Sequence, residues 1–144
     1  MTDPALSRLQ TLPSWMLGRA AALGHRLVAD QLARAELRLP HHAVLCAVAE
    51  YEPVAQAELA RTVKIDPKDM VAVLNDLQAR ELVSRTRDPK DARRNLITLS
   101  PAGRELLHHT EALGAEANAE LVAPLTPAER RQLNDLLGRI IAER

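Results

Sequence analysis

Apolar residues recur at helical spacing through the first part of the chain. The spacing predicts a long first helix from Ser14 to Leu39, and Pro40 is expected to stop it. Its apolar positions are Leu17, Leu23, Leu27, Val28 and Leu32. The segment from His41 to Glu50 is apolar almost all round, which is typical of a short helix at the centre of a bundle, and Pro53 ends it.

Two further helices are predicted downstream. Gln56 to Thr62 forms a short third helix by the same spacing. A fourth begins at Asp66-Pro67, because aspartate is a preferred N-cap and proline fits the first helical position. Asp69 adds an acid to the first turn, where the helix dipole favours negative charge. The expected buried positions of this helix are Met70, Val73, Leu74 and Leu77.

The hydrophobic period changes from helical to alternating at Leu82. Leu82–Arg87 and Asn95–Leu99 are predicted strands, and the polar residues 88–94 between them form a long, basic hairpin tip. Ser100-Pro101 then starts a fifth helix that runs to about Val122, and Thr126-Pro127 starts a sixth that runs to the end. With no linker or internal repeat, residues 1–144 are expected to form a single, mainly α domain.

Composition agrees with a helical fold and limits the cellular location that we expect. Among 144 residues, 47% are hydrophobic and Trp15 and Tyr51 are the only aromatics, so leucine, valine, isoleucine and alanine must fill the core. The single Cys46 excludes an internal disulfide framework. No apolar run reaches the roughly 18 residues of a membrane span, and Met1–Gln10 lacks a signal pattern. We therefore expect a cytoplasmic protein with no membrane partner.

The charge of the chain balances overall and not locally. Nineteen basic residues offset nineteen acidic ones, yet residues 61–94 carry nine basic and six acidic groups, a net charge of +3. The positive charges of the hairpin are Arg85, Arg87, Lys90, Arg93 and Arg94. Arginine suits phosphates and an electronegative minor groove. The alternative is a solvated hairpin in which Asp88 and Asp91 pair with these cations.

Two helices followed by a hairpin over residues 41–100 have the local plan of a winged helix-turn-helix. The fourth helix would be the recognition helix, with an exposed face of Lys68, Asp69, Ala72, Asn75, Asp76 and Gln78. Lys68 could contact a guanine edge or a phosphate, and Ala72 a thymine methyl. Asp69 either accepts from a cytosine amine or serves the helix start. Candidates for phosphate contacts on the third helix are Gln56, Arg61 and Thr62.

The hairpin sequence carries a resemblance to a known family. Asp88-Pro89-Lys90-Asp91-Ala92-Arg93, leading into Leu96 to Gly103, together with Leu59-Ala60, Ile65 and Leu82-Val83, resembles the MarR family of bacterial transcription regulators. The resemblance covers nearly the whole chain. It implies that Asp88 and Asp91 brace the wing and that Arg93 is the principal inserted or bracing group. Ala92 replaces a frequent arginine, for which Arg94 could compensate, and Glu81 stands where a glycine usually ends the recognition helix.

The resemblance also implies a homodimer built from residues 1–39 and 101–144. Apolar residues at both ends supply the material, although they could instead pack within one chain. They are Leu6, Leu9, Leu12, Leu121, Leu125, Leu133, Leu136, Leu137, Ile140 and Ile141. A dimer places two recognition helices about 34 Å apart, so a pseudo-palindromic operator is expected. The expected function is a DNA-binding regulator, most simply a repressor.

Small aromatic or anionic effectors are also implied by the resemblance. A crevice for one could be lined by Trp15, Arg19, His42 and Tyr51, although both aromatics could equally be ordinary, partly buried residues. A zinc-sensing alternative rests on His42, Cys46, His108 and His109. Cys46 could also be considered a peroxide sensor, but its neighbours Leu45, Ala47 and Val48 are expected to raise its pKa and shield it.

Other classes of protein are less well supported by the residues. The chain has no glycine-rich phosphate loop, no helix-spaced pair of carboxylates in an apolar setting, and no nucleophile with a clear local base beyond His42. We therefore expect no catalytic residue, no cofactor and no metal site. The main alternative from another class is a winged-helix module that binds protein.

Overall fold

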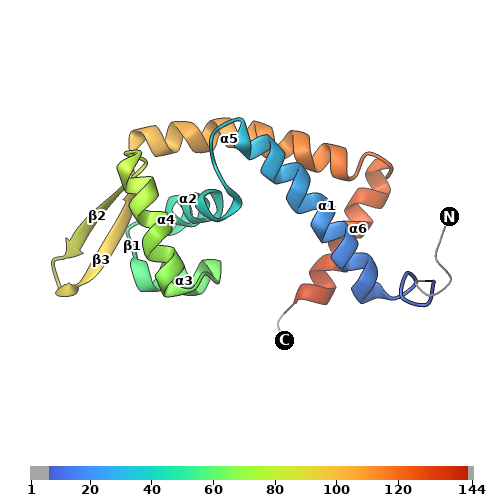
Figure 1. Cartoon of the computed structure of the whole chain (residues 1–144), viewed down its shortest axis with the longest axis horizontal. Helices are drawn as coiled ribbons and strands as arrows, with labels where there is room; N and C mark the ends of the chain where they lie inside the picture. Colours follow the sequence, from blue (N-terminus) through green and yellow to red (C-terminus); the bar gives the residue numbers. More distant parts are fainter. Residues whose placement is uncertain (1–6, 143–144) are drawn as a thin grey trace.

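The computed structural model describes residues 7–142, which form helices around a small antiparallel sheet (Figure 1). The elements are α1 (Pro13–Ala33), α2 (Leu39–Tyr51), β1 (Val54–Ala55), α3 (Gln56–Val63), α4 (Pro67–Ala79), β2 (Val83–Asp88), β3 (Asp91–Leu99), α5 (Pro101–Leu121) and α6 (Pro127–Ile141). The expected mainly α, winged helix-turn-helix fold is confirmed. In Figure 1, α5 runs along the molecule and links the end with α2, α3, α4 and the sheet to the end with α1 and α6.

The boundary between the first two helices differs from the sequence prediction. α1 ends at Ala33, and Glu36 then adopts the left-handed region with φ of 56°. Leu39 and Pro40 form the first turn of α2 and do not stop α1. Proline is accepted there because the first helical turn needs no N–H from it. The turn lets both Leu32 and Leu37 enter the core.

The predicted helix starts after Asp66, Ser100 and Thr126 are confirmed by their capping contacts. The Asp66 carboxylate accepts from the N–H of Lys68 at 2.9 Å, and the Ser100 hydroxyl accepts from the N–H of Gly103 at 3.0 Å. Thr126 and Glu129 form a reciprocal capping box. The hydrogen bonds with Thr126 also lower the pKa of the Glu129 carboxyl. Each of these helices therefore begins for a reason that is local in sequence.

The sheet has a third strand and a shorter hairpin tip than expected. Its order is β1-β3-β2, and β1 pairs with β3 at Val54↔Ile97 and Ala55↔Leu96. The predicted long tip over residues 88–94 is wrong, because β2 reaches Asp88 and β3 begins at Asp91. The register shifts from Arg87↔Asn95 to Asp88↔Asp91, so residues 92–94 are extra on β3 and form a bulge.

The core lies in the winged part of the chain. Fully buried side chains come mainly from α2, α3, α4 and the sheet: Val44, Leu45, Val48, Leu59, Met70, Leu74, Leu77 and Ile97. By contrast, α1 buries only Leu32 among its described residues, and α6 buries none. Both helices therefore keep apolar side chains at the surface. Within residues 7–142, no helix is long and apolar enough to cross a bilayer.

Gly103 allows α5 to start against the sheet. A Cβ built on Gly103 would overlap the carbonyl oxygen of Leu82 and lie 2.8 Å from Cδ1 of Leu99. We expect Gly103→Ala to lower the free energy of unfolding by about 3 kcal/mol, the upper end for overpacking, because one obstacle is backbone. Gly114→Ala is the control on the same helix, because nothing lies within 4 Å of its Cβ position. That control should be neutral or stabilising in urea denaturation, and equal midpoints for the two variants would contradict the prediction.

Candidate nucleic-acid interface

Helices α3 and α4 form the helix-turn-helix. Between them, Lys64 adopts a left-handed conformation with φ of 58°, and its N–H donates to the carbonyl of Ala60. The N–H of Ile65 donates to the same carbonyl at 3.0 Å. This turn ends α3 and allows Asp66 to start α4 in a new direction. The predicted face of α4 is exposed along its whole length: Lys68, Asp69, Ala72, Asn75, Asp76 and Gln78.

The C-terminal half of that face is tied to the rest of the chain. Asn75 accepts a hydrogen bond from the guanidinium of Arg85 on β2. The carboxylate of Asp76 lies 3.1 Å from Nε2 of His41 on α2. Because these two polar side chains already have partners, the N-terminal half of α4 is the part most available to a ligand.

Sequence reasoning missed Val71 in that half. Its side chain is 43% exposed, beside Lys68 and Ala72 on the surface of α4. The signal was present, because Val71 falls outside the buried stripe of Met70, Val73, Leu74 and Leu77. Asp69 does not cap the helix. The side-chain cap of α4 is made by Asp66, and Asp69 lies exposed in the first turn.

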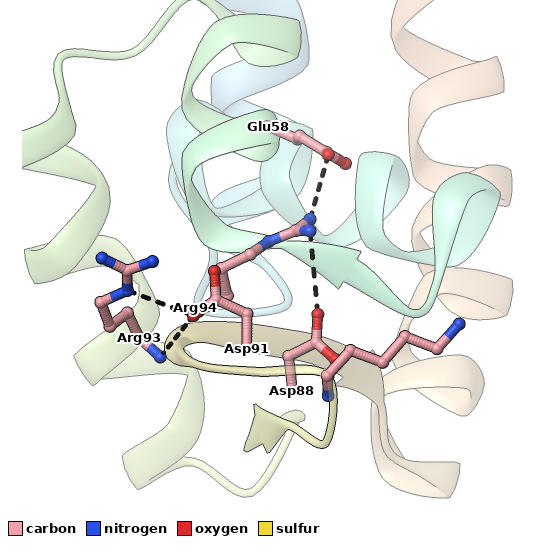
Figure 2. Close-up of polar contacts among 6 residues, drawn as sticks. Glu58, Asp88, Asp91, Arg93 and Arg94 are labelled. Carbon is pink, nitrogen blue, oxygen red and sulfur yellow. Dashed lines mark hydrogen bonds and ion pairs between the residues drawn. The ribbon is translucent and has the colours of Figure 1, made fainter.

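Two aspartates order the tip of the hairpin, as Figure 2 shows. One oxygen of Asp91 accepts from the backbone N–H of Arg93 at 3.0 Å and from its Nε at 3.4 Å. Asp88 accepts from the N–H of Lys90 at 2.9 Å. The Arg93 side chain is nevertheless 93% exposed. At the tip, Arg93 therefore contacts Asp91 while its side chain stays in solvent.

The five cations of the hairpin fall into two groups. Arg94 pairs with Glu58 at 3.2 Å and with Asp88 at 3.7 Å, and Arg85 is bound to Asn75. Among residues 7–142, no acidic partner is found for Arg87 or Lys90, and both are exposed. The paired alternative therefore describes Arg94, which does not extend outward in place of the missing arginine at position 92. Arg93 has an ion pair as well, with Asp91 at 3.4 Å, but its side chain stays 93% exposed. Arg87, Lys90 and Arg93 are therefore the cations open to a ligand, and they are called the free cations below.

The remaining phosphate-contact candidates lie on α3. Gln56, half-buried at the start of α3, lines a hollow of about 180 Å³ with Pro67 and Val71 from α4. Arg61 and Thr62 are exposed near the end of α3. Helices α3 and α4 and the hairpin lie together at one end of the molecule, away from α6 (Figure 1).

A family model described as MarR family matches residues 35–94, from the turn after α1 through the bulge of β3. The chain belongs to the MarR family. It is 29% identical over 126 residues to the HTH-type transcriptional repressor Rv2887 of Mycobacterium tuberculosis, covering 88% of this chain and 91% of that one. A further relative, the uncharacterised HTH-type regulator YdgJ of Bacillus subtilis, is 32% identical over 89 residues, which span 62% of this chain and 54% of that one.

Solved MarR-family and related structures have the same fold. A probable transcriptional regulator from Pseudomonas aeruginosa superimposes with a TM-score of 0.82 and 33% identity, covering 92% of this chain and 99% of that one. The structure of Rv2887 in complex with DNA superimposes with a TM-score of 0.81 and 26% identity over the same shares of the two chains. The family resemblance seen in the hairpin motif is confirmed by these comparisons.

The four residues considered for a MarR-type effector crevice are not brought together within one chain. Trp15 and Arg19 lie in the first turns of α1, at the end far from α2 (Figure 1). His42 lies near the start of α2, whereas Tyr51 is its last residue and is 52% exposed. Nine helical residues separate these two, a rise of about 13 Å. A common pocket for the set is thus not formed by the described part of a single subunit.

The histidine and cysteine of α2 form a small polar cluster with α5. Nε2 of His42 lies 3.1 Å from the Thr110 hydroxyl and 3.6 Å from Sγ of Cys46. Burial lowers the pKa of His42 and raises the pKa of Cys46, which Glu111 raises further. The pKa of Cys46 rises as expected, but Cys46 as a residue is exposed, so its neighbours shield it only in part. His108 and His109 are exposed on α5, and residues 7–142 contain no group of three or more metal-ligating side chains.

Cys46 should be a slow nucleophile despite its exposure. Because its pKa is raised, the thiolate fraction at neutral pH is smaller than that of an ordinary cysteine, and the thiolate is the reactive form. We expect alkylation by iodoacetamide at pH 7.5 to be several-fold slower than for free cysteine, with the rate still rising above pH 9. Mass spectrometry of timed samples measures this, and a rate above that of free cysteine would contradict it.

Proposed function

We propose that this chain is a transcriptional repressor that binds duplex DNA as a homodimer. In this proposal the N-terminal half of α4 enters the major groove and Arg93 reaches the adjacent minor groove. The observation that carries it is the hairpin tip, where Asp91 holds a guanidinium that is 93% exposed beside an exposed recognition face. The repressor name and DNA complex of the relative Rv2887 support it. Such a role also implies a cytoplasmic location.

The proposed dimer uses the apolar surface that one chain leaves open. The exposed members are Leu9, Leu12, Met16, Leu17, Leu23, Leu136, Ile140 and Ile141. The half-buried residues Leu121, Leu125, Leu133 and Leu137 line a hollow of about 510 Å³ between α1, α5 and α6. Leu6, also expected here, lies outside the described residues. A second copy that covers this surface would fix two α4 helices about 34 Å apart, which gives a pseudo-palindromic operator.

Release by a small aromatic or anionic effector is a further part of the proposal. Trp15 and Arg19 lie one helical turn apart on α1, where a ring and a guanidinium could meet such a ligand. His42 and Tyr51 would have to come from elsewhere in the dimer to join them. A thermal-shift screen of aromatic acids, with Arg19→Gln as the comparison, tests whether α1 is involved.

The proposal is tested by selecting duplexes from a random pool with the wild-type protein. We expect an enriched pseudo-palindrome bound by two chains, with affinity that falls steeply with salt. If the three free cations of each wing contribute, the slope of log affinity against log salt is about −5, from about −0.9 per neutralised phosphate. Fluorescence anisotropy at several salt concentrations measures it. No enriched sequence, or a slope near zero, would instead favour a protein-binding module.

A further inference from the structure

The bulge in β3 turns neighbouring arginines in opposite directions. Arg93 and Arg94 are adjacent residues of the bulge, and a bulge can change the direction of a side chain. Figure 2 shows Arg93 on one side of the hairpin and the Arg94 guanidinium on the other, between Glu58 and Asp88. The bulge at residues 92–94 places this reversal where the ladder between β2 and β3 is interrupted. Two arginines that look equivalent in sequence therefore face different surroundings.

Arg94 connects two elements that are far apart in the chain. Nη2 lies 3.2 Å from Oε1 of Glu58, in the first turn of α3, and Nη1 lies 3.7 Å from Oδ2 of Asp88, at the end of β2. The Asp88 side chain is 12% exposed, whereas those of Arg94 and Glu58 are 46% and 50% exposed. With two carboxylates around one guanidinium, the group has a net charge of −1. A phosphate that approached Arg94 would therefore also meet two carboxylates, whose negative charge opposes it.

The outer hairpin has little else to hold it against the helices. The third strand, β1, pairs with β3 only at Leu96 and Ile97. Residues 87–95 extend beyond that support, and the described contacts that join them to α3 include the Arg94–Glu58 pair. The angle of the hairpin decides where Arg93 stands relative to α4. A contact from the bulge to α3 is therefore well placed to control it.

We propose that Arg94 is a positioning residue, which straps the wing to α3 through Glu58, is held within the wing by Asp88, and thereby sets the place of Arg93, and that it is not a DNA ligand. The consequence for DNA rests on the proposed function, whereas the strap itself is a property of the free protein. This assignment separates Arg94 from Arg93, Lys90 and Arg87, the cations that remain free to meet a phosphate backbone.

Replacing Glu58 tests the proposal, because the two possible roles of Arg94 predict opposite changes in operator affinity. Glu58→Gln removes a negative charge near the DNA-facing side, so electrostatics alone would strengthen binding to any duplex. The same change breaks one half of the strap, so it weakens binding to the selected operator if Arg94 positions the wing. If Arg94 contacts DNA directly, Glu58→Gln frees it and the operator is bound more tightly.

The experiment compares Glu58→Gln, Arg94→Gln and the double variant with wild type. The matched control is Glu50→Gln, which removes the same charge from an exposed position on α2. We expect each strap variant to bind the selected duplex about fivefold more weakly, as suits exposed ion pairs, and the double variant to be no weaker than Arg94→Gln alone. Binding of Glu58→Gln to a random-sequence duplex should be unchanged or tighter. Tighter operator binding by Glu58→Gln, or fully additive losses, would overturn the proposal.

A second measurement needs no DNA. Amide hydrogen exchange of residues 91–95 should become several-fold faster in both single variants, with exchange in the buried part of α4 unchanged as the control for folding. Unchanged exchange in the hairpin would overturn the strap even if operator binding fell. Conversely, if wild type enriches no duplex but its hairpin exchange responds as expected, the DNA-binding proposal fails and the strap stands.

Discussion

Replacing Arg93 with alanine should weaken binding to the selected operator by at least about 30-fold. The side chain is 93% exposed, and Asp91 binds both its Nε and the backbone N–H of Arg93, so the guanidinium is available to DNA at the tip of the hairpin. A specific arginine contact contributes about 1–3 kcal/mol, and a dimer has two wings. Even the lower figure, counted twice, gives about 2 kcal/mol, which corresponds to this loss.

Fluorescence anisotropy with the selected duplex measures the effect, and size-exclusion chromatography checks that the dimer is intact. Arg131→Ala is the matched control, because it removes an exposed arginine from α6, far from the hairpin in the fold. It should change operator affinity by less than about threefold, since exposed charges beyond a Debye length are largely screened. If Arg93→Ala binds the operator as wild type does, the wing role is wrong.

Replacing Leu136 with aspartate should abolish the dimer and lower operator affinity by at least about 100-fold. Leu136 is 48% exposed in one chain and belongs to α6, which buries no residue within the subunit. The variant should therefore keep the fold of the monomer. In the proposed dimer, however, the new carboxylate would be desolvated without a partner. Two separate monomers also lose the effective concentration that links the half-sites, which is worth about 10²–10⁴-fold.

Light scattering coupled to size exclusion gives the mass of each species, and circular dichroism checks the helices. Asn134→Asp is the comparison, because it adds the same charge at an exposed polar position of α6 that lies on a different face from Leu136. It should remain dimeric. A Leu136→Asp protein that is still dimeric would show that the subunits associate through another surface.

Several elements could be predicted because their causes are local. Asp66, Ser100 and Thr126 each accept a hydrogen bond from an N–H two or three residues later, so the starts of α4, α5 and α6 need no distant partner. The family resemblance places a glycine at the end of the recognition helix, where this chain has Glu81. Glu81 adopts the left-handed backbone that suits a glycine there, with φ of 58°.

Other elements depended on packing and were missed or misplaced. Proline at position 40 is compatible with the end of one helix or the start of the next, and the burial of Leu37 favoured the second. Strand β1 has only two residues, too few for an alternating pattern, and exists because β3 lies beside it. The bulge at residues 92–94 depends on the register in which β2 and β3 pair, and composition does not encode that register.

By itself the sequence determined the helix starts, the family of the fold and the local excess of positive charge in residues 61–94. Through the family resemblance it named Arg93 as the principal inserted or bracing group, but it left Arg94 as a second cation that could face DNA. Only the tertiary structure separated them. Within the bulge the two side chains point in different directions, and the packing of α3 brought Glu58 to the Arg94 guanidinium from 36 positions away in the chain. Arg94 is therefore bound within the chain, whereas the Arg93 side chain remains exposed to a partner.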